Sequence, residues 1–398
     1  MVKFAHFADC HLGGWRQEEL QKVNFESFRK AVDIIIEKNV DFLLISGDLF
    51  DSAYPPIEIL KETFSEFKRI KEKGIPVFLI AGSHDFSASG KTFLDVLEKA
   101  GFCKNVENFE VQEDGRIKLK PIKFKDIAIF GYSGKKSSME IEDLKKVYLD
   151  SVYSFTILMI HTTIKDVIGT LPIEYIETKN LPLANYYAMG HIHQVFKKQE
   201  SNSLFIYPGP IYPNNFQELI DLNYGSFELV EIENSKVKTE NIRLKIKDVA
   251  FIEIELNNGL TATEKIIKEL DKFNLKDKIV LLKLKGKLNP GKTGDIKFNE
   301  IESFVQKKEC YSFLRNTTAL ESLESLDNQI SFELENTNNL EVKIIEEYTK
   351  QNLSDFNKFL PQIIESLAIE KNEDEKSNIF ESRFLSELKK ILNLDGLI

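Results

Sequence analysis

Residues 2–14 read Val-Lys-Phe-Ala-His-Phe-Ala-Asp-Cys-His-Leu-Gly-Gly, a short apolar run that ends at Asp9 and His11. Four later segments repeat this arrangement of an apolar run followed by polar residues. They are Phe42–Ser46 before Gly47-Asp48-Leu-Phe-Asp51, Val77–Ala81 before Gly82-Ser83-His84-Asp85, Phe155–Ile160 before His161, and Tyr186–Met189 before Gly190-His191-Ile-His193. Short runs of branched and aromatic residues are typical of buried strands in an α/β protein. Ligands of such sheets gather at the carboxyl ends of the strands, so we expect all five segments to meet at one edge.

The segments between these runs have helical periodicity. In Phe25–Asn39 the apolar residues recur on one helical face, and Ile57–Lys73 is similar. The alternation of strands and helices continues to Phe227–Glu231, which we interpret as the last strand of this unit. At 398 residues the chain is long enough for two or three domains.

Composition narrows the class of protein. The chain is 42% hydrophobic and 29% charged, as in ordinary globular proteins, and its net charge of −10 argues against electrostatic coating of nucleic acid. Any DNA contact must therefore be local. Three widely spaced cysteines argue against a disulfide framework. No secretory signal or membrane span is evident, so we expect no membrane association and a cytoplasmic location.

A second module follows residue 236. Val249–Leu256 and Lys278–Lys287 have the pattern of strands, and Thr263–Phe273 between them has that of a helix. Its lysines give it a basic side that either contacts DNA or is simply solvated. Beyond Asn316 the chain becomes acidic, as in a linker. Amphipathic helices expected at Phe356–Leu367 and Ser377–Leu394 either fold back or dock on another protein.

The polar residues at the strand ends have the chemistry of metal ligands. Aspartate and histidine supply the oxygen and nitrogen donors that suit Mn²⁺, Fe²⁺ or Zn²⁺. Alternation along an extended strand end places Asp9 and His11 on one side, and likewise His191 and His193. Five of the six histidines lie at these strand ends.

The complete set resembles the calcineurin-like metallophosphoesterase superfamily, whose pattern is Asp-x-His, Gly-Asp-x-x-Asp, Gly-Asn-His-Asp/Glu, His and Gly-His-x-His. The opening run, Ser46-Gly-Asp-Leu-Phe50 and Tyr207-Pro-Gly-Pro-Ile211 are similar to SbcD or Mre-eleven-type nucleases of DNA double-strand-break repair. This resemblance implies an α/β fold, a metallophosphoesterase β-sandwich flanked by helices, with a small α/β capping domain and C-terminal helices. The implied boundaries are 1–232 for the nuclease domain, 240–315 for the capping domain, 316–354 for the acidic linker and 355–398 for a helical region that binds an ATPase.

The resemblance also implies the ligand set. One metal ion would take Asp9, His11, Asp48 and His193, and the second would take Asp48, Ser83, His161 and His191. Asp48 would bridge two divalent ions, for which we expect Mn²⁺, and His84 would face the scissile phosphate as the catalytic acid.

Two positions depart from the nuclease pattern. Ser83 replaces the usual asparagine, so we expect a weaker second metal site. Asp51 stands where many of these nucleases carry histidine, and we expect it to hydrogen-bond the catalytic His84.

The implied function is a manganese-dependent DNA nuclease, with 3′-to-5′ exonuclease activity on duplex ends and endonuclease activity on single strands. It would work with a Rad-fifty or SbcC-type coiled-coil ATPase bound through the C-terminal helices, near the nucleoid. A homodimer is expected through Ile57–Lys71 and Lys91–Lys99, with candidate contacts Leu60, Phe64, Leu94 and Leu97. The alternatives are a phosphatase or phosphodiesterase acting on small substrates, and a DNA-end scaffold with weakened catalysis.

Several nearby residues have simpler interpretations. We expect His6 to be a core residue, because it shares strand parity with Phe4 and Ala8. Cys10 should point away from its neighbouring ligands, and Asp85 should bond the loop backbone. Residues expected to shape the rim of the site are Tyr207, Gly209 and Pro210.

Overall fold

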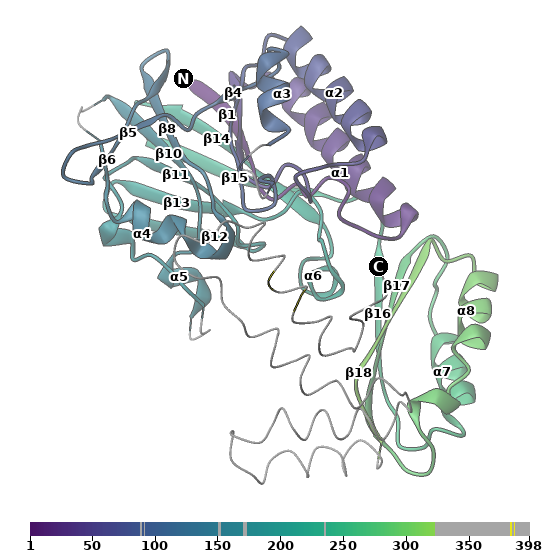
Figure 1. The fold of residues 1–398 in the computed structure, drawn as a ribbon. Coiled ribbons are helices and arrows are strands. Elements are labelled where there is room, and N and C mark those ends of the chain that lie inside the picture. The colour runs from purple at the N-terminus through teal and green to yellow at the C-terminus, as the bar shows by residue number, and fades with distance from the viewer. Residues whose placement is uncertain are drawn as a thin grey trace. The chain divides into compact units, whose positions relative to one another are not determined.

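The computed structural model describes residues 1–322, apart from residues 88–89, 91, 150–152, 170–172 and 235, together with Arg383 and Ser386. The chain divides into two compact units, Met1–Glu321 and Ser322–Ile398, and the elements below belong to the first unit (Figure 1). The acidic linker expected at 316–354 is described only as far as Ser322. Apart from Arg383 and Ser386, the terminal helices expected within 355–398 lie outside the described residues.

Six strands form the first sheet, in the order β15-β14-β1-β2-β3-β4. Their bounds are β1 (Val2–Phe7), β2 (Phe42–Ser46), β3 (Val77–Ile80), β4 (Lys104–Asn105), β14 (Gly225–Glu233) and β15 (Lys236–Leu244). β1, β2 and β3 are parallel, whereas β14 is antiparallel to β1 and β15 is antiparallel to β14. The expected last strand at Phe227–Glu231 is therefore followed by one more strand of the same sheet.

A second sheet has the order β12-β13-β11-β10-β8-β7. Its strands are β7 (Ile122–Phe124), β8 (Ile127–Tyr132), β10 (Phe155–His161), β11 (Tyr186–Gly190), β12 (Val195–Glu200) and β13 (Ser203–Pro208). β8, β10, β11 and β13 are parallel, and the register places His161 opposite Gly190. Two of the predicted ligand segments therefore end side by side.

The two sheets form a sandwich, as expected from the resemblance. Alternate side chains of each strand enter a shared layer, in which Phe4 and Phe42 of the first sheet meet Tyr186 of the second. The rings of Phe4 and Phe42 stack with centroids 4.8 Å apart, and Tyr186 meets Phe4 edge-on at 5.3 Å. This layer fixes the face-to-face position of the two sheets.

Helices α1 (Glu18–Glu37), α2 (Ile57–Glu72) and α3 (Leu94–Lys99) lie on the outer face of the first sheet (Figure 1). α1 begins at Glu18 rather than at the expected Phe25. The additional turns bury Leu20 and Val23 in a separate apolar cluster, which is why the helix extends.

Two of the side chains expected at a dimer contact belong to the core. Leu94 and Leu97 are fully buried against the first sheet. They cannot meet a second copy of the chain without unfolding α3, so that part of the dimer prediction is wrong. The exposed apolar side chains of α2 and α3 are Ile57 (71%) and Val96 (47%).

The outer face of the second sheet carries shorter elements. They are α4 (Glu140–Leu144), α5 (Lys165–Ile168), the 3-10 helices η1 (Lys136–Ser138) and η2 (Thr178–Asn180), and the small sheet of β5 (Phe109–Val111), β6 (Ile117–Leu119) and β9 (Val147–Tyr148). Helix α6 (Phe216–Leu222) follows β13 and approaches the site described below.

A smaller three-stranded sheet has the order β16-β17-β18. Its elements are β16 (Val249–Glu255), α7 (Ala262–Leu270), β17 (Ile279–Leu288), η3 (Thr293–Asp295), α8 (Phe298–Lys307) and β18 (Ser312–Ser322). Both helices lie on one face of the sheet, around a core of its own (Figure 1). The expected boundaries at residues 240 and 315 fall within β15 and β18.

The lysines on β17 are paired with carboxylates. Glu253 of β16 lies 3.5 Å from Lys283 and 2.5 Å from Lys285, and Lys287 lies 3.4 Å from Glu321. These pairs reduce the positive charge that the sequence suggested for this side of the small sheet. In the described part of the chain, no helix is long and apolar enough to cross a membrane.

We expect Phe42→Ala to lower the free energy of unfolding by about 3–5 kcal/mol, because it leaves a cavity in the layer between the sheets. Urea unfolding followed by circular dichroism measures this. Phe273→Ala is the matched control, since Phe273 is 45% exposed and its truncation should change the stability by less than about 0.5 kcal/mol. Equal effects of the two substitutions would contradict the packing described here.

Candidate metal centre

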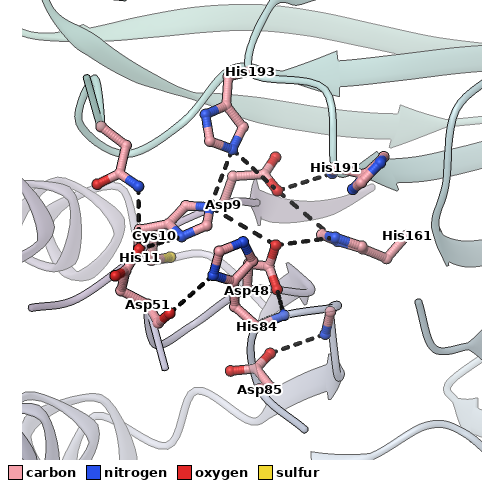
Figure 2. A network of polar contacts seen from close by, with 12 residues as sticks. Asp9, Cys10, His11, Asp48, Asp51, His84, Asp85, His161, His191 and His193 are labelled. Carbon is pink, nitrogen blue, oxygen red and sulfur yellow. Dashed lines mark hydrogen bonds and ion pairs between the residues drawn. The ribbon is translucent and has the colours of Figure 1, made fainter. Parts of the chain in front are cut away.

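Five loops deliver polar side chains to one edge of the sandwich, as the sequence predicted (Figure 2). The loops after β1, β2 and β3 carry the first three groups, and β10 and β11 end at the other two. Because these strands are parallel within each sheet, their carboxyl ends meet at the same edge. The side chains that gather there are Asp9, His11, Asp48, His84, His161, His191 and His193.

The backbone at these strand ends is unusual. Four residues here have positive φ angles, in the left-handed region that residues other than glycine rarely adopt. They are Asp9 (50°), His11 (42°), Asp48 (48°) and His191 (90°). Hydrogen bonds hold the loops together, since the Asp9 amide donates to Gly47 O (3.2 Å) and the His11 amide to Asp48 O (3.0 Å). Such strained residues cluster at functional sites, where the surrounding structure holds them.

Asp48 lies at the centre of the cluster. Its Oδ2 is 3.1 Å from Nε2 of His161 and 3.7 Å from Nε2 of His11, which come from different sheets. Its Oδ1 accepts a hydrogen bond from the His84 amide (2.8 Å). Asp48 therefore stands between two sets of potential ligands, the position expected of a bridging carboxylate.

A second group of donors comprises Asp9, His11 and His193, whose ligand atoms lie within 4.8 Å of one another. Nε2 of His11 lies 3.0 Å from Nε2 of His193, which is 4.0 Å from Oδ1 of Asp9. Nδ1 of each histidine faces a carboxylate, Asp51 for His11 (3.1 Å) and Glu218 for His193 (2.9 Å). When both rings are neutral and donate Nδ1–H to these carboxylates, as metal-binding histidines do, their Nε2 atoms present lone pairs to the same space.

This arrangement fits a cation. Oδ2 of Asp9 is buried without a hydrogen-bond partner. Unpaired buried acceptors are costly, and a bound divalent ion satisfies several of them at once. Oxygen and imidazole donors without cysteine suit Mn²⁺, Fe²⁺ or Zn²⁺.

The electrostatics of the cluster also favour positive charge. Burial alone would lower the pKa of His161, but the neighbouring Asp48 carboxylate raises it to about 10. Burial likewise opposes protonation of His193, yet Glu218 and Asp9 raise its pKa to about 9. Burial raises the pKa of Asp9, because its carboxylate is removed from water. The carboxylates therefore stabilise cationic charge at the centre of the site.

Glycines of the motifs leave space for these ligands. A Cβ on Gly47 would lie 2.1 Å from Nδ1 of His161, and one on Gly82 would lie 2.2 Å from Oδ1 of Asp48. A Cβ on Gly190 would lie 1.9 Å from Ser46 O, which is the partner of His161 Nδ1 at 2.9 Å. The glycines thus allow the loops to approach closely enough to form the cluster.

His84 is exposed beside the cluster, and its support differs from the expectation. We expected a bond from the Asp51 carboxylate, but Nδ1 of His84 bonds the main-chain oxygen of Asp51 (2.8 Å). The Asp51 carboxylate is already engaged by His11 and by the amide of Asn214 (3.1 Å). The carboxylate therefore orients a predicted metal ligand.

The remaining predicted ligands are less closely gathered. His191 packs its ring against His161 at 5.1 Å, and it belongs to none of the three closely spaced donor groups found among the described residues. Its amide donates to Oδ1 of Asp9 (2.8 Å). Ser83 is half-buried in the wall of a cavity next to His84.

Two supporting residues, Asn214 and Glu218, were missed in the sequence. Glu218 accepts a hydrogen bond from the main-chain N–H of Asn214 (2.7 Å) and also faces His193. The side-chain amide of Asn214 in turn donates to Asp51. This chain of contacts joins the partners of His11 and His193. The available signal was that these residues follow β13, which is parallel to β11 and ends at the same edge.

The simpler interpretations largely agree with the structure. His6 is buried and bonds Tyr186 (3.0 Å), and Cys10 lies in the core beneath the helices. Asp85 accepts amide hydrogens from Phe50 (3.1 Å) and Gly82 (2.9 Å). Tyr207 is different, because it is fully buried and its hydroxyl donates to Thr162 O (2.7 Å). It therefore supports the loop after His161 from below and does not form the rim.

The sandwich and its edge of aspartates and histidines define a metallophosphoesterase. Consistent with this class, the family model described as "Calcineurin-like phosphoesterase" matches residues 2–195. Divalent metal ions are the cofactors that this family implies.

Two curated relatives carry the name "DNA double-strand break repair protein Mre11". The one from Archaeoglobus fulgidus is 26% identical over 373 residues, covering 87% of this chain and 80% of the relative. The one from Methanococcus maripaludis is 32% identical over 272 residues, covering 62% of this chain and 70% of the relative. The chain belongs to the Mre11 family of calcineurin-like phosphoesterases. A solved structure of a dimetal phosphatase from Danio rerio aligns with 62% of this chain and 97% of the phosphatase chain, with 11% sequence identity and a TM-score of 0.41.

We expect Gly47→Ala to weaken metal binding at least about tenfold, because the new Cβ displaces the imidazole of His161. Isothermal titration with Mn²⁺ measures the affinity. Gly74→Ala is the matched control, since Gly74 also has a positive φ but faces open space. It carries the same backbone strain of about 1–2 kcal/mol and should keep the wild-type affinity. Unchanged binding in both variants would exclude the close approach at Gly47.

We expect Glu218→Ala to reduce metal affinity by about 10- to 100-fold, because His193 loses the carboxylate that orients it and raises its basicity. Glu218→Gln keeps an oxygen acceptor for Nδ1 of His193 and should lose less. Asp221→Ala removes an exposed acid from the same helix and should have no effect. If Asp221→Ala weakened Mn²⁺ binding in calorimetry as much as Glu218→Ala, the general charge of α6 would be responsible.

Proposed function

We propose that this chain is a manganese-dependent DNA nuclease that degrades duplex ends from 3′ to 5′ and cuts single strands. The observation that carries the proposal is the position of Asp48, whose Oδ2 faces His11 on one side and His161 on the other. In this proposal one ion is held by Asp9, His11, Asp48 and His193. The other is held by Asp48, Ser83, His161 and His191, more weakly because a serine hydroxyl replaces an amide oxygen.

Divalent ions in such a site activate water and neutralise charge on the phosphate oxygens. The remaining chemistry belongs to the protein. Asp48 places the two ligand sets next to each other, and its bond from the His84 amide ties the catalytic loop to them. The phosphodiester would lie over this cluster with His84 at its side.

His84 is positioned as the proton donor. A carbonyl oxygen can only accept, so the contact with Asp51 O assigns the hydrogen to Nδ1 and leaves Nε2 for exchange with substrate. As water adds to phosphorus, the bond to the 3′ oxygen breaks, and that oxygen takes the proton from His84. The products are a 5′-phosphate and a 3′-hydroxyl.

DNA as the substrate is supported by the printed names of the relatives. The small sheet contributes less than its sequence suggested, because Lys283 and Lys285 are paired with Glu253. Residues 355–398 would bind a Rad-fifty or SbcC-type ATPase, and the chain would form a homodimer through α2, which carries the remaining candidate contacts Leu60 and Phe64. A nucleoid-associated, cytoplasmic location accompanies this role.

The test is degradation of a linear duplex labelled at one strand end, with Mn²⁺ or Mg²⁺. We expect Mn²⁺-dependent trimming from the 3′ end, reduced by at least about 100-fold in His84→Ala because the leaving oxygen loses its proton donor. Calorimetry with Mn²⁺ is the control and should give the wild-type affinity, since His84 is not a proposed ligand.

The other outcomes identify the alternatives. Hydrolysis of small phosphodiesters without degradation of DNA would indicate a small-substrate phosphodiesterase. Tight DNA-end binding without hydrolysis of either substrate, in the presence of bound metal, would indicate a scaffold.

A further inference from the structure

A cavity of about 530 Å³ opens beside His84. It lies between the loops that follow β2 and β3 and the start of η1, and Ser83 and His84 form part of its wall. Its volume is within the range of about 300–1,000 Å³ that is usual for pockets that bind small molecules or parts of larger ligands. The cavity therefore adjoins the proposed reaction centre.

An aromatic side chain dominates one side of this cavity. Tyr54 is 70% exposed, and Phe86 lies in the same lining. The loop that carries Tyr54 is constrained, because Pro55 and Pro56 follow it directly and the Asp51 amide bonds Leu12 O (3.3 Å). A large exposed ring on a stiff loop is a ready surface for stacking a flat ligand, since little entropy is lost on binding.

The same cavity has a cation at its rim. Lys136 is exposed, and within the described chain no carboxylate pairs with it, although its neighbour Lys135 bonds Asp143 at 2.6 Å. An unpaired ammonium next to an aromatic surface matches a nucleotide, which combines a flat base with a phosphate.

We propose that this cavity binds the nucleotide on the 5′ side of the bond to be cut, with its base stacked on Tyr54 and its own 5′ phosphate at Lys136. The inference rests on the proposed nuclease function. In that function His84 protonates the 3′ oxygen that leaves, and this oxygen belongs to the nucleotide on the 5′ side. The cavity beside His84 is therefore where that nucleotide lies.

The experiment compares the release of the 3′-terminal nucleotide from three blunt-ended oligonucleotide duplexes with Mn²⁺, which differ only in the strand that carries this nucleotide. One carries all its bases, the second lacks the base of the penultimate nucleotide, and the third lacks the base of the terminal nucleotide. The penultimate nucleotide is on the 5′ side of the first bond cut. Wild type, Tyr54→Ala and Tyr54→Phe are compared by kcat/KM on each.

We expect Tyr54→Ala to lower kcat/KM by roughly 5- to 100-fold on the complete oligonucleotide, the size of one lost base stack. Tyr54→Ala should lower kcat/KM by a similar factor when only the terminal base is missing. When the penultimate base is missing, wild type and Tyr54→Ala should agree within about twofold, because no base remains to stack. Tyr54→Phe should restore the wild-type value.

A separate comparison tests whether Lys136 binds the 5′ phosphate. Lys136→Ala should lower kcat/KM on a dinucleotide with a 5′ phosphate and have no effect on the same dinucleotide without it. Equal effects on the two dinucleotides would overturn the assignment of the phosphate to Lys136.

Binding separates failure of this inference from failure of the nuclease function. An oligonucleotide with 2-aminopurine at the penultimate position should lose fluorescence on binding wild type and Tyr54→Phe, and less on binding Tyr54→Ala. Quenching by wild type without cleavage would overturn the nuclease and keep the base site. If wild type cleaved the DNA and Tyr54→Ala lowered kcat/KM equally on all three oligonucleotides, the base site would be overturned and the nuclease function kept.

The alternative occupant of the surface around Tyr54 is a second copy of the chain. Sedimentation velocity of wild type and Tyr54→Ala tests it at the concentrations of the assay. A change of oligomeric state in the variant, with no dependence on the penultimate base, would assign Tyr54 to that interface and overturn the proposal.

Discussion

The buried carboxylate of Asp48 is the constraint on which the site depends. A buried anion is costly unless it is compensated, and its compensation comes from both sheets, through His11 after β1 and His161 at the end of β10. The two sheets must therefore pack correctly before the charge is satisfied. The aromatic layer around Phe4, Phe42 and Tyr186 fixes that packing from within. Assembly of the metal centre and formation of the sandwich are consequently one process, and a divalent ion that binds the native state adds to its stability.

The two halves of the cluster are supported by different physical means. His11 and His193 are oriented by the carboxylates of Asp51 and Glu218, so their positions depend on charge and hydrogen bonding. His161 is oriented by a main-chain oxygen, Ser46 O, and by glycines that let the backbone approach its ring. Its position depends mainly on steric fit. The positions of His11 and His193 should therefore be sensitive to changes of charge next to them, and the position of His161 to changes of side-chain volume.

The sequence predicted what is local. Each ligand segment directly follows a strand, so β2 could be placed residue for residue and the convergence of Asp9, Asp48 and His161 followed from strand direction. Contacts that depend on tertiary structure could not be read in this way. Glu218 lies 25 residues from His193 on a short helix, and no pattern links the two. The burial of Leu97 was missed because an apolar helix face is the same in sequence whether it meets a sheet or a second subunit.

The contact between His84 and the main-chain oxygen of Asp51 has an evolutionary consequence. Every amino acid carries a carbonyl oxygen, so the side chain at position 51 can change without removing the acceptor that orients the proposed proton donor. The support of His11 and the hydrogen bond from Asn214 change with it. Substitution at this one position can thus change the support of a predicted metal ligand while the acceptor for His84 is kept.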